Sequence, residues 1–225
     1  MALIKPLNYH LKLRPIRNNL KTEKMKKNKI LLTSIFVVLL GISSFGQGGG
    51  VWNFDWSMGF PMGDTKDFID QPSFRGFSIE GRGFVTEKIA IGGIGAWNVF
   101  YQNNGNTTIV ENGGTRKIYG YQRRYLNVMP IMVTAHYYFS QGSVQPYIGA
   151  GLGTYYIESR DFMGIYYLQG KDWHFGIAPE VGVVMPFGSG NTGLNVNFKY
   201  NMAAKTKNEP SYSWFGVNVG ISYLF

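Results

Sequence analysis

The sequence lacks cysteine entirely, and beyond its first 46 residues it also lacks any long apolar run. Without cysteine, the chain can form neither disulfides nor thiolate metal sites. A membrane-spanning helix needs about 20 consecutive apolar residues, so the later part of the chain has no candidate for one. Alanine, leucine and glutamate, which favour helices, are sparse. If this part enters a membrane, the remaining structure that satisfies its backbone in lipid is a closed β-barrel.

Histidine is scarce as well, and of three in the chain only His136 and His174 follow residue 46. A hydrolase needs a nucleophile beside a general base, yet the sequence has no Gly-x-Ser-x-Gly elbow. Its glycines alternate within predicted strands, where they relieve crowding, rather than forming a phosphate loop. We therefore expect no catalytic residue, no cofactor and no metal site. The two histidines are interpreted as hydrogen-bonded fillers of the interior.

The net charge of +9 is concentrated at the N-terminus. Nine of the 22 basic residues but one of the 13 acidic residues precede residue 47, so the rest of the chain has 13 basic and 12 acidic side chains and a charge of +1. A nearly neutral folded part gives no electrostatic argument for nucleic-acid binding. We expect no nucleic-acid partner.

Residues 25–46 have the three-part pattern of a secretory signal peptide. A short basic run opens the segment, the apolar stretch 30–40 follows, and small residues at Ser44 and Gly46 mark a cleavage site. The apolar stretch is too short to cross a membrane as a helix, which favours a cleaved signal over a membrane anchor. The chain is therefore expected to be exported.

Signal peptides begin with their basic region, so Met25 is a better initiator than Met1. Residues 1–24 are interpreted as a non-native or upstream extension, although the sequence leaves the choice of start codon open. The mature domain then covers residues 47–225, enough for one domain with a core or one small barrel.

The clearest strand pattern lies in residues 215–225. The even positions are small or polar apart from Leu224, and the odd positions are apolar, which predicts a strand with one apolar face. The odd positions are Phe215, Val217, Val219, Ile221, Tyr223 and Phe225. The pattern polar-x-Gly-x-x-aromatic-x-Phe, formed by Asn218, Gly220, Tyr223 and Phe225, resembles the C-terminal assembly signal of bacterial outer-membrane barrels. The last strand of a soluble sandwich is the alternative at this point.

The same period of two recurs along the mature chain and predicts eight strands of similar length, joined by connections that alternate between long and short. Long connections are expected at residues 64–72, 102–116, 158–171 and 202–212, and short turns at residues 86–88, 140–143 and 188–191. Up-and-down outer-membrane barrels have short periplasmic turns and long outer loops. The pattern therefore predicts an all-β, eight-stranded antiparallel up-and-down transmembrane β-barrel, because a soluble sandwich has no reason for such regular alternation.

Aromatic residues near the strand ends are interpreted as the two interfacial girdles of such a barrel. They are Trp52, Trp97, Tyr101, Tyr125, Tyr137, Tyr147, Tyr155, Trp173, Tyr200 and Tyr223. The facing of the fifth strand is ambiguous, because Tyr147 and Tyr155 lie on one face and Ile148 and Leu152 on the other.

Pro130 and Pro179 fall within predicted strands. A closed barrel has no free edge for a proline, so we expect a bulge or a missing ladder bond at each. The segments that contain them, 129–135 and 178–183, together with 145–153, resemble the outer-membrane β-barrel domain family that includes the OmpW, OmpX and OmpA-barrel types. The resemblance covers the mature chain and implies a fold and a location, but no reaction.

Alternation places polar and charged side chains inside the barrel, where an eight-stranded lumen is just wide enough for side chains to fill. Buried charges must pair, so we expect an interior polar network. Its predicted members are Glu80, Arg82, His174, Glu180 and Lys199. A polar plug that holds the barrel together is favoured, and a polar path for a solute is the alternative.

Four basic residues cluster at the outer end of the fourth predicted strand: Arg116, Lys117, Arg123 and Arg124. Such a cluster can contact anionic lipid head groups. Ordinary solvated loop charge is an equal or better explanation.

These features predict a monomeric integral protein of the bacterial outer membrane, surrounded by outer-membrane lipid and inserted by the barrel-assembly machinery. We expect a structural or interaction role, through long extracellular loops above a side-chain-filled lumen. A narrow channel for small or apolar solutes is the alternative, and a barrel enzyme acting on lipid is third. The sequence identifies neither a ligand nor an extracellular or periplasmic protein partner.

Overall fold

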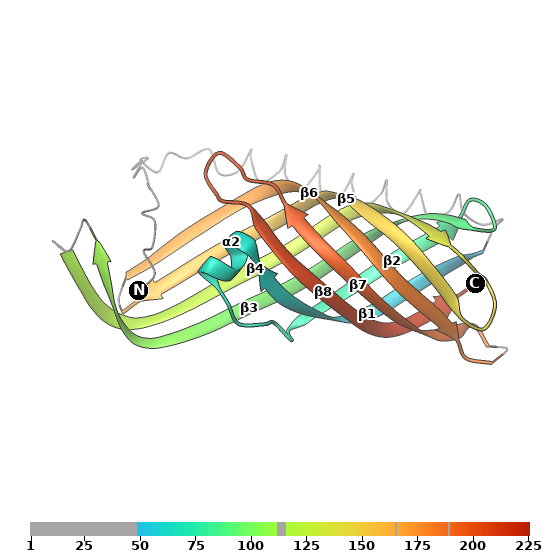
Figure 1. Ribbon diagram of the computed structural model, residues 1–225, viewed down its shortest axis with the longest axis horizontal. Coiled ribbons are helices and arrows are strands. Elements are labelled where there is room, and N and C mark those ends of the chain that lie inside the picture. Colours follow the sequence, from blue (N-terminus) through green and yellow to red (C-terminus); the bar gives the residue numbers. More distant parts are fainter. Residues whose placement is uncertain (1–48, 112–115, 165, 189) are drawn as a thin grey trace, which may run out of the picture.

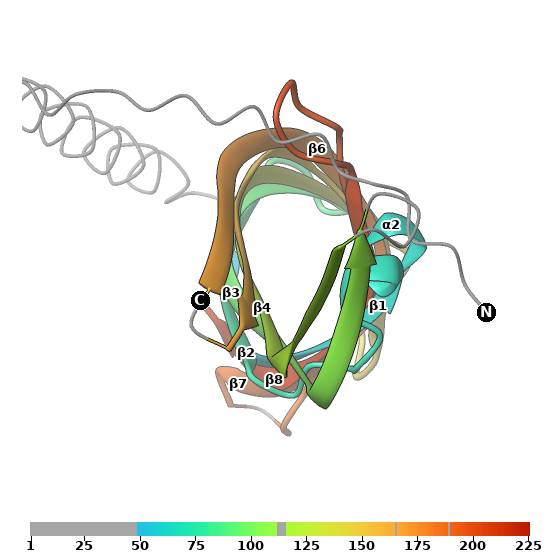
Figure 2. The same ribbon diagram turned by 90° about the vertical axis from the view of Figure 1, so that its left-hand side faces the viewer.

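The structure is a computed structural model that describes residues 49–111, 116–164, 166–188 and 190–225. The predicted signal peptide and the extension before it lie outside these residues. Eight antiparallel strands form a closed barrel (Figure 1), and Figure 2 shows the ring along its axis. The predicted eight-stranded barrel is confirmed. The strands are β1 (Gly50–Met62), β2 (Gly76–Phe84), β3 (Ile89–Glu111), β4 (Arg116–Tyr138), β5 (Gln145–Met163), β6 (Tyr166–Pro186), β7 (Thr192–Ala203) and β8 (Tyr212–Leu224).

One end of the barrel carries short turns at residues 85–88, 139–144 and 187–191, and we call it the inner end. The turns are closed by backbone hydrogen bonds, such as the 2.8 Å bond from Phe187 N–H to the Thr192 carbonyl. At the opposite, outer end, β1 and β2 are joined by residues 63–75 and β7 and β8 by residues 204–211, whereas only residues 112–115 and 164–165 lie between β3 and β4 and between β5 and β6. The predicted alternation of short and long connections therefore holds for two of the four outer connections and is wrong for the other two.

The strands are not of similar length, so that expectation is wrong. β3 and β4 have 23 residues each, whereas β2 has nine. The expected loops at 102–116 and 158–171 are largely strand, because β3 to β6 continue as paired hairpins beyond the barrel wall (Figure 1). A register shift between Asn103 and Gly105, where Gly105 has φ of 64°, lets the pairing resume along residues such as Thr107.

The connection from β1 to β2 contains α2 (Gly63–Phe68), a helix of six residues at the outer end. Among the described residues, no helix is long and apolar enough to cross a bilayer. The backbone N–H of Ser213 donates to Thr65 Oγ1 at 2.8 Å, and Ile69 just after the helix is fully buried. These contacts fix the helix against β8 at the mouth of the barrel.

Side chains alternate between the lumen and the outer surface. On β4, Ile131 and Val133 are 57% and 65% exposed, while Met132 and Thr134 beside them are buried. The exposed positions form an apolar belt around the barrel. Its largest members include Phe54, Trp56, Phe77, Ile79, Ile91, Ile131, Val133, Leu152, Phe175, Ile177, Val181, Phe198 and Ile221. Soluble monomers rarely expose so much contiguous apolar surface, whereas a membrane barrel presents it to lipid.

Two predicted girdle residues, Tyr147 and Tyr155, are instead fully buried in the lumen, and Ile148 and Leu152 face outward. β5 therefore turns these two tyrosines inward, and the physical cause is the glycines of the neighbouring strand. Tyr147 pairs with Gly182 of β6, where an added Cβ would lie 2.5 Å from the tyrosine ring. The glycines of β6, which have no side chain, thus leave room for the tyrosine rings of β5.

A gap in the ladder lies beside each of the two strand prolines, as expected. The pairs Gly95↔Ile131 and Asn98↔Val128 border the gap beside Pro130, and Ile177↔Met202 and Glu180↔Lys199 border the gap beside Pro179. The register is the same on both sides of each gap. The prolines therefore remove ladder bonds without adding a bulge.

Candidate functional site

The half of the lumen nearer the inner end holds a cluster that we call the charged layer: Glu80, Arg82, His136, Glu180 and Lys199. All five residues are buried. They come from four strands, β2, β4, β6 and β7. The layer therefore links β2, β4 and β6, which are not neighbours around the barrel wall.

Strand geometry explains why these side chains meet. Glu80 and Arg82 are two residues apart on β2 and share its inner face, and Glu180 and Lys199 are direct cross-strand partners. Gly149 of β5 pairs with His136 on one side and with Glu180 on the other. Because an added Cβ at Gly149 would lie 2.3 Å from His136 Cδ2, the glycine provides the space in which the two side chains meet.

Arg82 is the centre of the layer. Its Nη2 lies 2.8 Å from Glu80 Oε2 and 3.1 Å from Glu180 Oε1. The same nitrogen donates to the Tyr147 hydroxyl, and Nη1 donates to the Tyr138 hydroxyl, both at 3.0 Å. The guanidinium carbon also lies 4.3 Å from the centroid of the Tyr147 ring. One cation thus satisfies two carboxylates and two hydroxyls.

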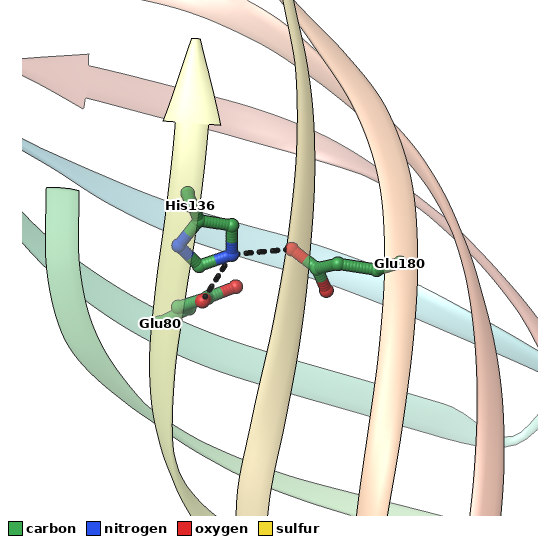
Figure 3. A group of neighbouring side chains, drawn as sticks. All are labelled: Glu80, His136 and Glu180. Atoms are coloured by element: carbon green, nitrogen blue, oxygen red, sulfur yellow. Dashed lines mark hydrogen bonds and ion pairs between the residues drawn. The ribbon is translucent and has the colours of Figure 1, made fainter. Parts of the chain in front are cut away.

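Glu180 joins the remaining members. Its Oε2 lies 2.6 Å from Lys199 Nζ, and its Oε1 lies 2.5 Å from His136 Nε2. The same His136 nitrogen is 3.4 Å from Glu80 Oε1, so the imidazole bridges the two glutamates, as Figure 3 shows. Charge-assisted contacts of this kind are the strong ones in a low-dielectric interior.

Asp55 of β1 adds a third carboxylate beside the layer. Both of its oxygens accept from Asn195 Nδ2 at 3.0 Å, and Asn195 Oδ1 in turn accepts from the Tyr147 hydroxyl at 3.2 Å. Three carboxylates thus face two permanent cations, Arg82 and Lys199.

Glu80, His136 and Glu180 also have the donor atoms of a divalent metal site, with one ligand atom of each within 4.8 Å of the others (Figure 3). Arg82 and Lys199, however, already place two positive charges on the same carboxylates. A divalent ion would have to displace these cations or add its charge to theirs. The donor set therefore fits ion pairs better than a metal.

The half of the lumen nearer the outer end holds a second cluster, which we call the apolar layer. Its core is Phe100, Leu126, Tyr155 and Trp214, all almost fully buried. The Trp214 ring packs edge-on against Tyr155 and Phe100, at centroid distances of 5.3 and 6.2 Å. Aromatic packing of this kind fills the lumen above the charged layer.

A cavity of about 20 Å³ separates the two layers. Its lining includes Lys199, Asn98, Asn201 and Asn218 on the polar side and Trp214 on the apolar side. A space of this size and polarity is large enough for about one water molecule. It is too small to form a passage.

Of the predicted network, the structure brings together Glu80, Arg82, Glu180 and Lys199, and it places His174 elsewhere. His174 lies in the lumen at the outer end, where its Nδ1 is 2.8 Å from the carbonyl oxygen of Ala204. Its ring packs against Tyr212 at 5.4 Å.

Sequence reasoning missed His136 as a member of the charged layer, although its position in β4 already indicated an inward side chain. It also missed Tyr147, because the ambiguous facing of β5 left its ring on the wrong side of the wall. The glycine between His136 and Glu180 was the available signal, since it marks a place where two side chains need room.

The four predicted head-group residues separate in the structure. The side chains of Arg116 and Lys117 lie outside the part that the structure describes. Arg123 is exposed on the outer face, whereas Arg124 points into the mouth. There Arg124 Nε lies 3.1 Å from Asp161 Oδ2 and its Nη1 donates to the Phe68 carbonyl at 2.9 Å, so Arg124 is not on the lipid-facing side.

The residues of the predicted C-terminal signal have distinct places in the closed barrel. Asn218 points inward and donates to Asn197 Oδ1 at 2.6 Å. An added Cβ at Gly220 would lie 2.0 Å from the carbonyl oxygen of Phe54, so this position accepts only glycine. Tyr223 and Phe225 lie on the outer face with ring centroids 6.3 Å apart.

No protein-family model matches the sequence. No curated protein sequence matches it either. Solved structures do: Neisserial surface protein A (NspA) is similar at a TM-score of 0.53 and 15% identity, over 80% of this chain and 98% of that one. Ail, the attachment invasion locus protein of Yersinia pestis, is similar at a TM-score of 0.50 and 11% identity, over 79% and 99%. The chain therefore has the fold of the eight-stranded outer-membrane barrels.

Proposed function

We propose that this protein is an integral barrel of the bacterial outer membrane that acts as a structural or interaction protein and not as an open pore. The observation that carries the proposal is the filled lumen. The charged layer and the apolar layer lie one above the other, and the members of both are buried. An eight-stranded barrel filled in this way has no continuous path for a solute.

Several features support an outer-membrane location. The apolar belt needs a hydrocarbon environment, and the segment 25–46 has the pattern of an export signal. The last strand carries the residues of an assembly signal, and its side chains alternate as a lipid-facing strand requires. Insertion by the barrel-assembly machinery follows from that signal.

An interaction role is supported by the unequal strands. β3 to β6 continue beyond the wall, and their hairpins present exposed aromatic side chains such as Tyr119 and Tyr121. Extensions of this kind add paired, ordered surface outside the membrane without changing the barrel itself.

A narrow channel is the second candidate, and the cavity between the layers is the observation that favours it. Lys199 and three asparagines line a polar space that a rearrangement of Trp214 could connect to the outer end. In the resting protein the cavity has no connection to the outer end, because the charged layer and the apolar layer both remain packed around it.

We propose no enzymatic activity. His136 contacts two glutamates and the Tyr147 ring, and His174 contacts a backbone carbonyl and a tyrosine ring. Neither histidine hydrogen-bonds a serine or threonine hydroxyl within the described ranges, so a hydrolase would lack its nucleophile and base pair.

The test is conductance of the refolded, full-length protein in a planar bilayer. A silent bilayer, with heat-modifiable gel mobility as evidence that the barrel is folded, is the expected result. Discrete and reproducible conductance steps would reject the closed lumen and favour the channel.

A further inference from the structure

A basic and aromatic pocket lies on the outer surface of β4 and β5, outside the lumen. Its volume is about 280 Å³, and it is lined by Arg123, Tyr125, Asn127, Arg160 and Phe162. Tyr125 is the cross-strand partner of Arg160, and Arg123 is the partner of Phe162. The two arginines and two rings therefore alternate on one outward patch.

The pocket lies just beyond the apolar belt. Asn127 is two residues from Met129, whose partner Tyr156 packs against Trp173 at a centroid distance of 5.3 Å. Tyrosine and tryptophan at this level mark the interface with the head groups. Tyr125 is four positions before Met129, which is a distance of about 10 Å along the membrane normal for a tilted strand. The arginines are thus at the depth of lipid phosphates.

The charge of the pocket is positive. Arg123 lies over the Tyr121 ring at 5.7 Å, and no carboxylate among the described residues forms an ion pair with it. Arg160 pairs with Glu158 at 2.7 Å, but 42% of its side chain remains exposed. One carboxylate therefore faces two guanidinium groups.

A third arginine extends the same surface toward β3. The Tyr125 ring packs against Tyr101 at 4.7 Å, and Arg75 lies over the Tyr101 ring at 5.9 Å. Phe162 packs edge-on against Tyr125 at 5.8 Å. An aromatic row with guanidinium groups along it suits a ligand that is anionic at one point and apolar beside it.

We propose that this pocket binds the phosphorylated head group of an outer-leaflet lipid, with Arg123 and Arg160 on the phosphate and the Tyr125 and Phe162 rings against the rest of the head group. Guanidinium groups match phosphate oxygens through paired hydrogen bonds. Acyl chains of the same lipid would continue along the apolar belt directly below. The inference rests on the proposed outer-membrane placement.

The test titrates the folded full-length protein with bis-phosphorylated lipid A and, separately, with its dephosphorylated form, and follows binding by native mass spectrometry. We compare the double variant Arg123→Gln, Arg160→Gln with the control Lys88→Gln, Lys207→Gln, which loses the same charge at exposed positions elsewhere. Two head-group contacts correspond to about a tenfold or larger loss of affinity in the arginine variant. The affinities of the control variant and the wild type for the phosphorylated lipid should agree within about twofold.

Equal losses in the two double variants, or equal affinity of the wild type for the dephosphorylated lipid, would overturn the proposal. Displacement of the lipid by an equal concentration of inorganic phosphate would also overturn it, because the site would then bind a free anion. Insertion into vesicles of the dephosphorylated lipid, measured by heat-modifiable gel mobility, tests the membrane placement separately from the head-group site. A chain that does not insert contradicts the membrane placement, whereas one that inserts but shows no charge-dependent binding contradicts only the head-group site.

Discussion

The charged layer and the apolar layer fill the same lumen by different physical means. In the charged layer each member is needed by the others, because an unpaired buried charge is far more costly than a pair. In the apolar layer the contacts are non-directional, and loss of one side chain costs in proportion to the volume removed. The charged layer therefore fixes which strands face each other, and the apolar layer supplies filling.

The largest effect is expected for Arg82→Met. The change leaves Glu80 and Glu180 facing each other without their shared cation. The free energy of unfolding, measured by urea titration in lipid vesicles, should fall by about 4 kcal/mol. The control Lys88→Met removes an exposed cation and should change it by less than about 0.5 kcal/mol.

A double variant sharpens this prediction. Glu80→Gln with Arg82→Met removes one charge of each sign, so it should be less destabilised than Arg82→Met alone. A double variant as unstable as the sum of its parts would show that the layer is not a coupled unit.

The next effect is expected for Trp214→Ala in the apolar layer. The loss of packing against Tyr155 and Phe100 should lower the free energy of unfolding by about 3 kcal/mol. Bilayers containing the variant should remain silent, since the charged layer still closes the lumen below the enlarged cavity. Conductance steps in this variant would show instead that the tryptophan is the closure.

A smaller loss is expected for Gly149→Ala, which forces a methyl group between His136 and Glu180. Overpacking of this kind should cost about 2 kcal/mol in the same unfolding measurement. Gly95→Ala is the matched control, because an added Cβ there meets nothing within 4 Å. If the free energy of unfolding falls equally in both variants, the cause is a general property of strand glycines and not the space that Gly149 leaves between His136 and Glu180.

The smallest effect is expected for Glu158→Gln, on the outer surface beyond the girdle. Desolvation raises the pKa of the Glu158 carboxyl, but hydrogen bonds from Arg160 and Gln169 outweigh it and leave the pKa below its usual value. A lowered folded-state pKa stabilises the protein above the unfolded pKa, and the contribution disappears as pH falls through the folded value. The difference in stability from wild type should be below about 1 kcal/mol at pH 7 and shrink toward acid pH. A difference that grows in acid would contradict this.

Alternation alone was enough to predict the barrel. A period of two in the sequence identifies the strands and, except for β5, their lipid-facing sides, as β7 and β8 show, and short turns order the strands. Because the inward face follows from the same parity, the sequence alone places Glu80, Arg82, Glu180 and Lys199 in the lumen.

Pairing across strands could not be read in the same way. Which inward residues meet depends on register and on small residues of the strand between them, as Gly149 does for His136 and Glu180. The extended hairpins were missed for a related reason, since the Asn- and Gly-rich stretch 102–111 has loop composition but finds hydrogen-bond partners along β4. Composition describes one segment by itself, whereas a hydrogen-bond ladder depends on two neighbouring strands.

The closure between β1 and β8 has a consequence for the order of events in the life of the chain. Val51 pairs with Leu224, and Gly50 exchanges backbone hydrogen bonds of 2.8 and 3.0 Å with Phe225. The first strand therefore stays half-paired until the eighth has been synthesised and delivered. The barrel closes only after β8 is available, and until then one edge of β1 remains open to pairing with other strands.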